Sequence, residues 1–331
     1  GWVNIIEKFG KAKAYCENPF EVRREGTKEV LIPVKDEWIG DKRDGPLGTE
    51  MRKVEIYCES AGIAELPPAS IDAVFTDPPY LGNIQYAELM DFCYVWLRRL
   101  AGATAQVFQR PSTRNANELT ANCSMERGVV HFTQGISEIF SKMAAALKPG
   151  APLAFTYHHN SLEAYYPIAI AILDSRLTCS ASIPCPAEMG ASIHINGTGS
   201  SVVDTIFVCR SKGTVPVRLI ARTPKETAAL VRSDIAHLRK GTVILTIGDI
   251  KCLIHGHLIR LAIWYLKDSW NRRLSIEEKL LAIATQIMEM GGLKSIEQYL
   301  KEDLISVPKT QKTISREEVA IYRARQNEIS F

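Results

Sequence analysis

Four consecutive residues, Asp77, Pro78, Pro79 and Tyr80, have the types and spacing best suited to chemistry in this sequence. They follow an apolar run at 71–76 that is typical of a strand buried on both faces, and ligands of open α/β sheets bind at the carboxyl ends of strands. The prolines fix φ and have no N–H, while the Asp77 carboxylate accepts hydrogen bonds. Such a turn could accept two hydrogen bonds from one planar amino group while Tyr80 stacks on the attached ring. The simpler alternative is a Pro-Pro turn capped by Asp77.

Strand-like and helical segments alternate on either side of this turn. The spacing of apolar residues favours helices over 2–16, 86–100, 131–147 and 161–174. Short apolar runs between turn residues favour strands over 54–58, 71–76, 152–157, 177–184 and 202–209. The alternation predicts a mostly parallel α/β sheet that is covered on both sides.

The helix predicted after the turn carries a run of large apolar side chains. Leu89, Phe92 and Trp96 share one helical face, which predicts a place in the core rather than an aromatic platform for nucleic acid. The segment 102–130 that follows is polar and irregular, and we interpret it as a loop.

The last third of the chain changes to helices with little strand pattern. Capping boxes begin at Ser275, Ser295 and Ser315, and His255-Gly-His257 reads as a loop before a helix at 258–267. We therefore divide the chain into three parts. These are an N-terminal helix and linker (1–50), an α/β catalytic part (51–214) and a helical C-terminal domain (215–331).

The overall charge of the chain is too small to attract nucleic acid by itself. The 331 residues include 40 Lys and Arg against 37 Asp and Glu, a net charge of +3, so any phosphate contact must come from local patches. The stretch 210–240 has eight basic and two acidic residues, and a second patch flanks the polar segment. The alternative is that these are solvated helix faces. The candidates are Arg98, Arg99, Arg110, Arg218, Arg222 and Lys225.

Cysteine and histidine spacing argues against a metal site. The eight cysteines include no Cys-x-x-Cys pair, and neither His158-His159 nor the pair His255 and His257 has a third ligand at a suitable spacing. We expect a reducing, cytoplasmic location. The longest apolar run, Ala164–Leu173, is far short of the ~20 residues that span a bilayer, so we expect no membrane partner.

The turn resembles the amino-group-binding motif of the S-adenosylmethionine-dependent DNA amino methyltransferases. The segments 83–99, 147–150, 155–159 and 203–210 are similar to one subgroup. These are the large prokaryotic adenine-specific DNA methylases, which carry an N-terminal domain of unknown function and are often found near phage-defence genes. The resemblance implies a Rossmann-like methyltransferase sheet with S-adenosylmethionine as cofactor and DNA as partner, in restriction-modification or phage defence.

The resemblance also implies roles for individual residues. The Asp77 carboxylate and the Pro78 carbonyl would bind the exocyclic amine of a flipped base, and Tyr80 would stack on that base. Ser60 and Ala61 stand where these enzymes usually hold the adenine of the cofactor, with Asp77 beside it. Methyl transfer is then direct, with no covalent enzyme intermediate.

The chain departs from the family in one respect. The Phe-x-Gly-x-Gly motif that holds the methionine part of the cofactor is not found before Asp77, and Ile195–Gly199 reads as a turn rather than a replacement. We therefore expect an incomplete sheet that lacks its first strands, with 71–76 at its edge. An upstream polypeptide segment would complete the cofactor site, and this chain alone would bind the cofactor weakly. Cytosine-N4 or RNA methylation, or a silent nucleic-acid-binding remnant, remain as alternatives.

Overall fold

The computed structural model describes most of the chain as two compact units, Gly1–Ser60 and Ala61–Phe331. The described residues are 2–25, 28–35, 55–82, 84–122, 125, 127–186, 201, 203–211, 221, 223–241 and 243–301. In the first unit, α1 (Trp2–Glu17) precedes an antiparallel hairpin of β1 (Phe20–Glu25) and β2 (Lys28–Pro33). The helix predicted over 2–16 is confirmed. Tyr15 packs edge-on against Phe20 with ring centroids 5.1 Å apart, which joins the helix to the hairpin.

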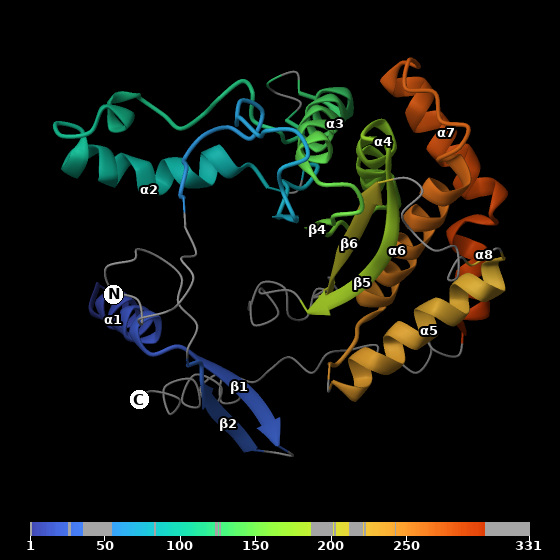
Figure 1. The fold of residues 1–331 in the computed structure, drawn as a ribbon, viewed down its shortest axis with the longest axis horizontal. Coiled ribbons are helices and arrows are strands. Elements are labelled where there is room, and N and C mark those ends of the chain that lie inside the picture. The colour runs from blue at the N-terminus through green and yellow to red at the C-terminus, as the bar shows by residue number, and fades with distance from the viewer. Residues whose placement is uncertain are drawn as a thin grey trace. The chain divides into compact units, whose positions relative to one another are not determined.

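The second unit is an α/β structure built around a mixed sheet (Figure 1). Among the described residues, its strands are β3 (Val74–Thr76), β4 (Leu153–Tyr157), β6 (Val203–Ser211) and β5 (Leu177–Pro186), in that order across the sheet. β3, β4 and β5 run in the same direction, while β6 is antiparallel to both of its neighbours. The predicted parallel direction holds for three of the four described strands, but the sheet is mixed, because the antiparallel β6 lies between β4 and β5. No helical pattern separates β5 from β6 in the sequence, and a parallel pair requires such a crossover.

Strand β3 lies at the edge of the sheet, as predicted for 71–76. Its Phe75 side chain is 79% exposed, so the strand is not buried on both faces. The prediction of a strand over 54–58 is also wrong, because Glu55–Cys58 has no regular secondary structure and Ile56 is 91% exposed. Apolar composition indicates a strand there, but no neighbouring strand pairs with it in the described part of the chain.

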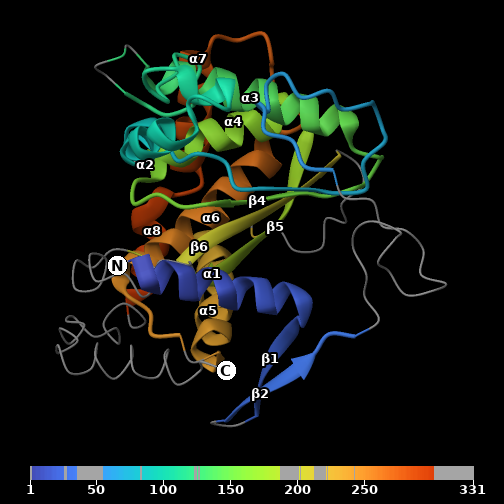
Figure 2. The same cartoon turned by 90° about the vertical axis from the view of Figure 1, so that its left-hand side faces the viewer.

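The core behind β4 is a stack of aromatic rings. Phe155 lies between Phe140 of α3 (Val129–Ala146) and Phe207 of β6, with centroid distances of 5.0 and 5.3 Å, and all three side chains are buried. A short helical turn, η4 (Leu162–Tyr165), leads into α4 (Tyr166–Asp174), which is buried on all sides from Pro167 onwards. In Figure 1 and again in Figure 2, α4 lies between α3 and α6 and contacts both. This core fixes the position of β4.

Helix α6 (Ile247–Leu266) packs directly on β5 and β6. A Cβ atom at Gly256 would lie 2.6 Å from Ser182 Oγ and 2.9 Å from Thr205 Cγ2, so only glycine allows this approach. The loop predicted at 255–257 is therefore wrong. The glycine between the two histidines serves close packing inside a helix rather than a chain reversal.

The remaining helices are α5 (Pro224–Lys240), α7 (Ile276–Glu289) and α8 (Gly292–Tyr299). The capping box at Ser275 is confirmed, but Ser295 lies inside α8 and Ser315 lies outside the described residues. Thr246 and Asp249 form a further capping box at the start of α6 that the sequence reading missed. Among the described helices, none is both long and apolar enough to cross a lipid bilayer.

Helix α2 (Tyr86–Ala101) exposes the face that was predicted to be core. Leu89, Phe92 and Trp96 are 61%, 75% and 61% exposed, so that prediction is wrong. The opposite side packs instead, where buried Tyr94 stacks on Phe108 of η2 (Gln106–Gln109). Helical spacing shows which residues share a face, but it does not determine whether anything covers that face.

The two serines with capping-box sequences provide a matched test of these assignments. Ser275 Oγ accepts a hydrogen bond from the Glu278 N–H, whereas Ser295 Oγ donates to the Gly291 carbonyl within its own helix. We expect Ser275→Ala to lower the free energy of unfolding by about 1 kcal/mol because an orphan N–H loses its partner. Ser295→Ala should change it by less than about 0.5 kcal/mol. Urea denaturation followed by circular dichroism measures both, and equal losses would contradict the assignment.

Candidate functional site

Register places the Asp77–Tyr80 turn beside the end of β4. Thr76 pairs with Phe155 in the parallel ladder, so Asp77 lies next to Thr156, and its Oδ1 accepts a hydrogen bond from Thr156 Oγ1. Pro78 is buried, whereas the Asp77 side chain is exposed. The hydroxyl therefore fixes the rotation of an otherwise accessible carboxylate.

Two adjacent acceptors in this turn are free of protein donors. Within the described part of the chain, no donor reaches Asp77 Oδ2 or the Pro78 carbonyl oxygen. Proline leaves no N–H at 78 or 79 to compete for a ligand. A ligand group with two N–H donors, such as a planar amine, could therefore bind both oxygens at once.

The backbone after the prolines is held by tyrosine hydroxyls. The Tyr80 N–H donates to Tyr86 Oη (3.3 Å), and the Leu81 N–H donates to Tyr157 Oη (3.4 Å). Tyr157 in turn donates to the Ala164 carbonyl (2.9 Å). The Tyr80 ring meets the Tyr157 ring edge-on, with centroids 5.4 Å apart. The turn is thus held by hydrogen bonds to β4 and to the start of α2, in addition to its chain connection with β3.

The tyrosines of the site are neutral at physiological pH. Burial raises the pKa of Tyr80, and the nearby carboxylates of Asp204 and Asp77 raise it further. Burial also raises the pKa of Tyr157 and of Tyr86. A neutral phenol presents an uncharged ring face, which suits stacking against a flat heterocycle better than a phenolate does.

A cysteine and a histidine meet close to the turn, but they do not form a nucleophile and base. His158 Nδ1 lies 3.3 Å from both Cys252 Sγ and the Val203 carbonyl oxygen and 3.8 Å from Asp204 Oδ1, so three groups approach the same nitrogen. Burial raises the pKa of the Cys252 thiol to about 11, which keeps it protonated and unreactive. No group of three or more potential metal ligands occurs among the residues that the structure describes.

His159 is held in one tautomer beside the same strand end. The Ser161 N–H donates to His159 Nδ1 (3.0 Å), which leaves the proton on Nε2. Burial lowers the pKa of His159, so the ring is neutral. Its backbone N–H donates to Tyr165 Oη (3.2 Å), which ties this strand end to the core. The sequence did not predict Thr156 or Tyr157 as site residues, because their proximity to Asp77 depends on strand register.

The predicted cofactor residues lie at the junction of the two units. Ser60 ends the first unit and Ala61 begins the second, and both are exposed. The residues after Ala61 are held against α3, since Lys142 Nζ donates to the carbonyls of Gly62 and Ala64. The segment Ile195–Gly199 lies outside the described residues.

The predicted nucleic-acid residues fall on two elements. Arg98 and Arg99 are exposed in the last turn of α2, and exposed Arg110 follows η2, where its carbonyl accepts from Tyr94 Oη (2.8 Å). Lys225 is exposed in the first turn of α5. Arg218 and Arg222 lie outside the described residues.

The polar segment after α2 is tied to that helix by one carboxylate. Asp91 accepts hydrogen bonds from the Ser112 hydroxyl and from the Thr113 N–H and hydroxyl, each 2.7 Å long. These bonds lower the pKa of Asp91 to about 2. The segment predicted as a loop therefore has a defined path along α2.

Comparison with known proteins finds no relative of this chain. The chain matches no protein family, no curated protein and no solved structure.

Stability should fall in acid because of one buried histidine behind the site. His255 is 1% exposed and packs edge-on against Tyr165, and burial lowers its pKa to about 4. In the unfolded chain this histidine binds a proton near pH 6.5, whereas in the folded chain it does so only near pH 4. The free energy of unfolding therefore keeps its full value above pH 6.5 and decreases as the pH falls towards 4. Relative to His255→Gln, the wild-type free energy of unfolding should drop by about 2 kcal/mol between pH 7.5 and pH 5. Urea titrations at both values measure this difference, and parallel pH dependence in the two proteins would contradict it.

Proposed function

We propose that the chain carries the amine-binding turn of an S-adenosylmethionine-dependent adenine-N6 DNA methyltransferase. The observation that carries the proposal is the pair of free acceptors, Asp77 Oδ2 and the Pro78 carbonyl, beside the half-buried neutral ring of Tyr80. Their position at the carboxyl end of a parallel strand pair is where α/β enzymes bind ligands. The parallel β3 and β4 pair also supports a Rossmann-like sheet as the architecture we propose.

The turn would activate an amine that is a weak nucleophile when conjugated to a base. Hydrogen bonds from its two N–H groups to Asp77 Oδ2 and the Pro78 carbonyl would draw the nitrogen lone pair out of conjugation. The bond from Thr156 to Oδ1 holds the carboxylate plane, so Oδ2 needs no reorientation when the amine binds. Preorganised acceptors of this kind lower the barrier because they are already aligned.

Tyr80 would bind the ring to which the amine is attached. A base must leave the duplex to reach this turn, which costs a few kcal/mol, and stacking on an aromatic ring returns part of that cost. The anchoring of the Tyr80 and Leu81 N–H groups keeps the ring in place before the base arrives.

S-adenosylmethionine would supply the methyl group, but the described residues do not build its site. Ser60 and Ala61 are exposed, and the sequence before Asp77 has no Phe-x-Gly-x-Gly motif to hold the methionine part. The described residues therefore provide acceptors for the amine but not a site for the cofactor.

Substitution of Asp77 tests the acceptor role. In protein that includes the upstream segment expected to complete the cofactor site, we expect Asp77→Ala to lower methyl transfer by about 100-fold or more, because it removes an interaction needed in the transition state. Thr156→Val should cost less, since it loosens the carboxylate without removing it. The side chain of Asp77 is exposed, so both variants should fold, which circular dichroism checks.

Radiolabelled methyl transfer to DNA and to RNA, followed by digestion to nucleosides, gives both the rate and the product. N6-methyladenine supports the proposal, whereas N4-methylcytosine or a methylated ribonucleoside would replace it with one of the related activities. Full activity in Asp77→Ala would refute the role of the turn. Nucleic-acid binding without transfer by the wild-type protein would identify a silent binding module.

The contribution of Tyr80 can be divided between ring and hydroxyl. Stacking on an aromatic side chain is worth about 1–3 kcal/mol per base, so Tyr80→Ala should reduce transfer roughly 10- to 100-fold. Tyr80→Phe keeps the ring and should stay close to wild type. Steady-state kinetics on the same DNA compares the two variants, and equal losses would mean that the hydroxyl is what matters.

A further inference from the structure

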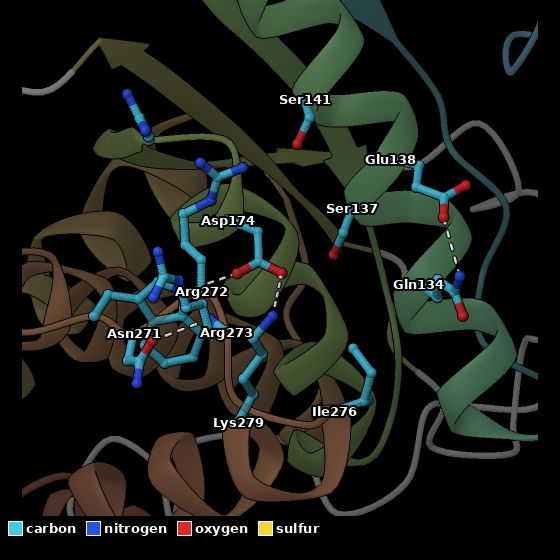
Figure 3. A pocket seen from close by; sticks show the side chains of 12 residues that line it. Gln134, Ser137, Glu138, Ser141, Asp174, Asn271, Arg272, Arg273, Ile276 and Lys279 are labelled. Carbon is cyan, nitrogen blue, oxygen red and sulfur yellow. Dashed lines mark hydrogen bonds and ion pairs between the residues drawn. The ribbon is translucent and has the colours of Figure 1, made fainter.

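A cavity of about 840 Å³ lies where α3, the end of α4 and the start of α7 meet (Figure 3). None of the Asp77–Tyr80 residues lines it. Its volume falls in the range of about 300–1,000 Å³ that is typical of small-molecule sites. The cavity therefore needs an explanation of its own, separate from the turn.

Basic residues outnumber acidic ones around this cavity. The charged lining residues are Arg176, Arg272, Arg273, Lys279, Glu138 and Asp174. The positive charge of Lys279 is already compensated, because its Nζ lies 2.9 Å from Asp174 Oδ2 in a buried ion pair. Asp174 Oδ1 accepts a second bond from Trp270 Nε1 (2.9 Å). The positive charge left at the cavity comes from the three arginines.

These arginines have no acidic partner. Across the residues that the structure describes, no carboxylate lies within ion-pair distance of the guanidinium groups of Arg176, Arg272 or Arg273. All three residues are exposed to solvent and line the cavity. A guanidinium presents a planar fork of donors that matches two oxygens of a phosphate, so three of them around one cleft favour a phosphorylated ligand.

The backbone at Arg176 points to the same conclusion. Its φ is +57°, a left-handed conformation in which glycine is favoured over other residues. Arg176 follows the end of α4 and leads into β5, and it is one of two non-glycine residues with positive φ in the described chain. An arginine at a position suited to glycine is consistent with a use for its side chain.

A buried hydroxyl on the cavity wall also lacks a partner. Ser137 is 7% exposed, and its Oγ makes no hydrogen bond. Figure 3 shows Ser137 on α3, on the side of that helix that faces Asp174. The hydroxyl oxygen itself is buried away from the cavity, so it concerns the packing of α3 and not the ligand.

We propose that this cleft binds the phosphate of a free nucleotide. Arg176, Arg272 and Arg273 bind the phosphate oxygens, and Trp270 offers an aromatic surface for the base. Arg176, Arg272 and Arg273 line this single cleft, whose volume matches one small ligand, whereas a nucleic-acid strand is normally bound along an extended basic groove. The proposal goes beyond the methyltransferase assignment, because it uses none of the residues of the turn.

Isothermal titration calorimetry on the full chain tests the site with three probes. These are ADP, inorganic phosphate and a short single-stranded oligonucleotide without a terminal phosphate. The double variant Arg272→Gln and Arg273→Gln should weaken ADP binding by about tenfold or more, because charge-assisted bonds to phosphate are lost. Lys294→Gln changes an exposed cation on α8 away from the cleft, and it should bind ADP as wild type does.

Arg176→Gly separates binding from folding. Glycine accepts the positive φ without strain, so the thermal midpoint should be unchanged or higher while ADP binding weakens. Asp77→Ala should leave ADP affinity unchanged, so this proposal and the methyltransferase proposal can fail independently. Absence of ADP binding, or equal affinity in the arginine variants and the wild type, overturns the site. Arginine-dependent binding of the oligonucleotide but not of ADP overturns the free nucleotide in favour of a strand.

Discussion

The parallel pairing of β3 with β4 determines what the Asp77–Tyr80 turn can do. It spans only three residues on each strand, yet it brings the Asp77 carboxylate to the Thr156 hydroxyl and the Tyr80 ring to Tyr157. β4 can serve as this template because Phe155 is fixed in an aromatic stack with its neighbours. The position of the short edge strand β3 is thus fixed by the aromatic core against which its partner β4 packs.

Burial keeps several rings of this region uncharged beside the carboxylates of Asp77 and Asp204. Tyrosine pKa values are raised and histidine pKa values are lowered by burial, so the rings of Tyr80, Tyr157 and His159 carry no charge. The Cys252 thiol is protonated for the same reason. The exposed Asp77 carboxylate is therefore an accessible acceptor beside these uncharged rings, an arrangement suited to binding an amine attached to a flat ring.

The arginine cleft depends on α4. The helix follows β4, is buried on all sides, and ends at Asp174, whose carboxylate binds Lys279 of α7 inside the cleft. Its next residues, Ser175 and Arg176, lead into β5. Because an unpaired buried charge is costly, the Asp174 and Lys279 pair holds α7 against α4 and so maintains the cleft wall.

The sequence by itself predicted many of the helices and strands and the residues of the turn, because apolar spacing and proline chemistry are local, although it was wrong at 54–58 and at 255–257. It correctly predicted α2, α3 and β4 and the capping box at Ser275. Only the tertiary structure decided that β6 runs antiparallel, that Gly256 lies inside a helix, that Phe92 is exposed, and that Thr156 meets Asp77. Each of these depends on a partner distant in the chain. A periodic pattern specifies an apolar face, but long-range packing determines what, if anything, covers it.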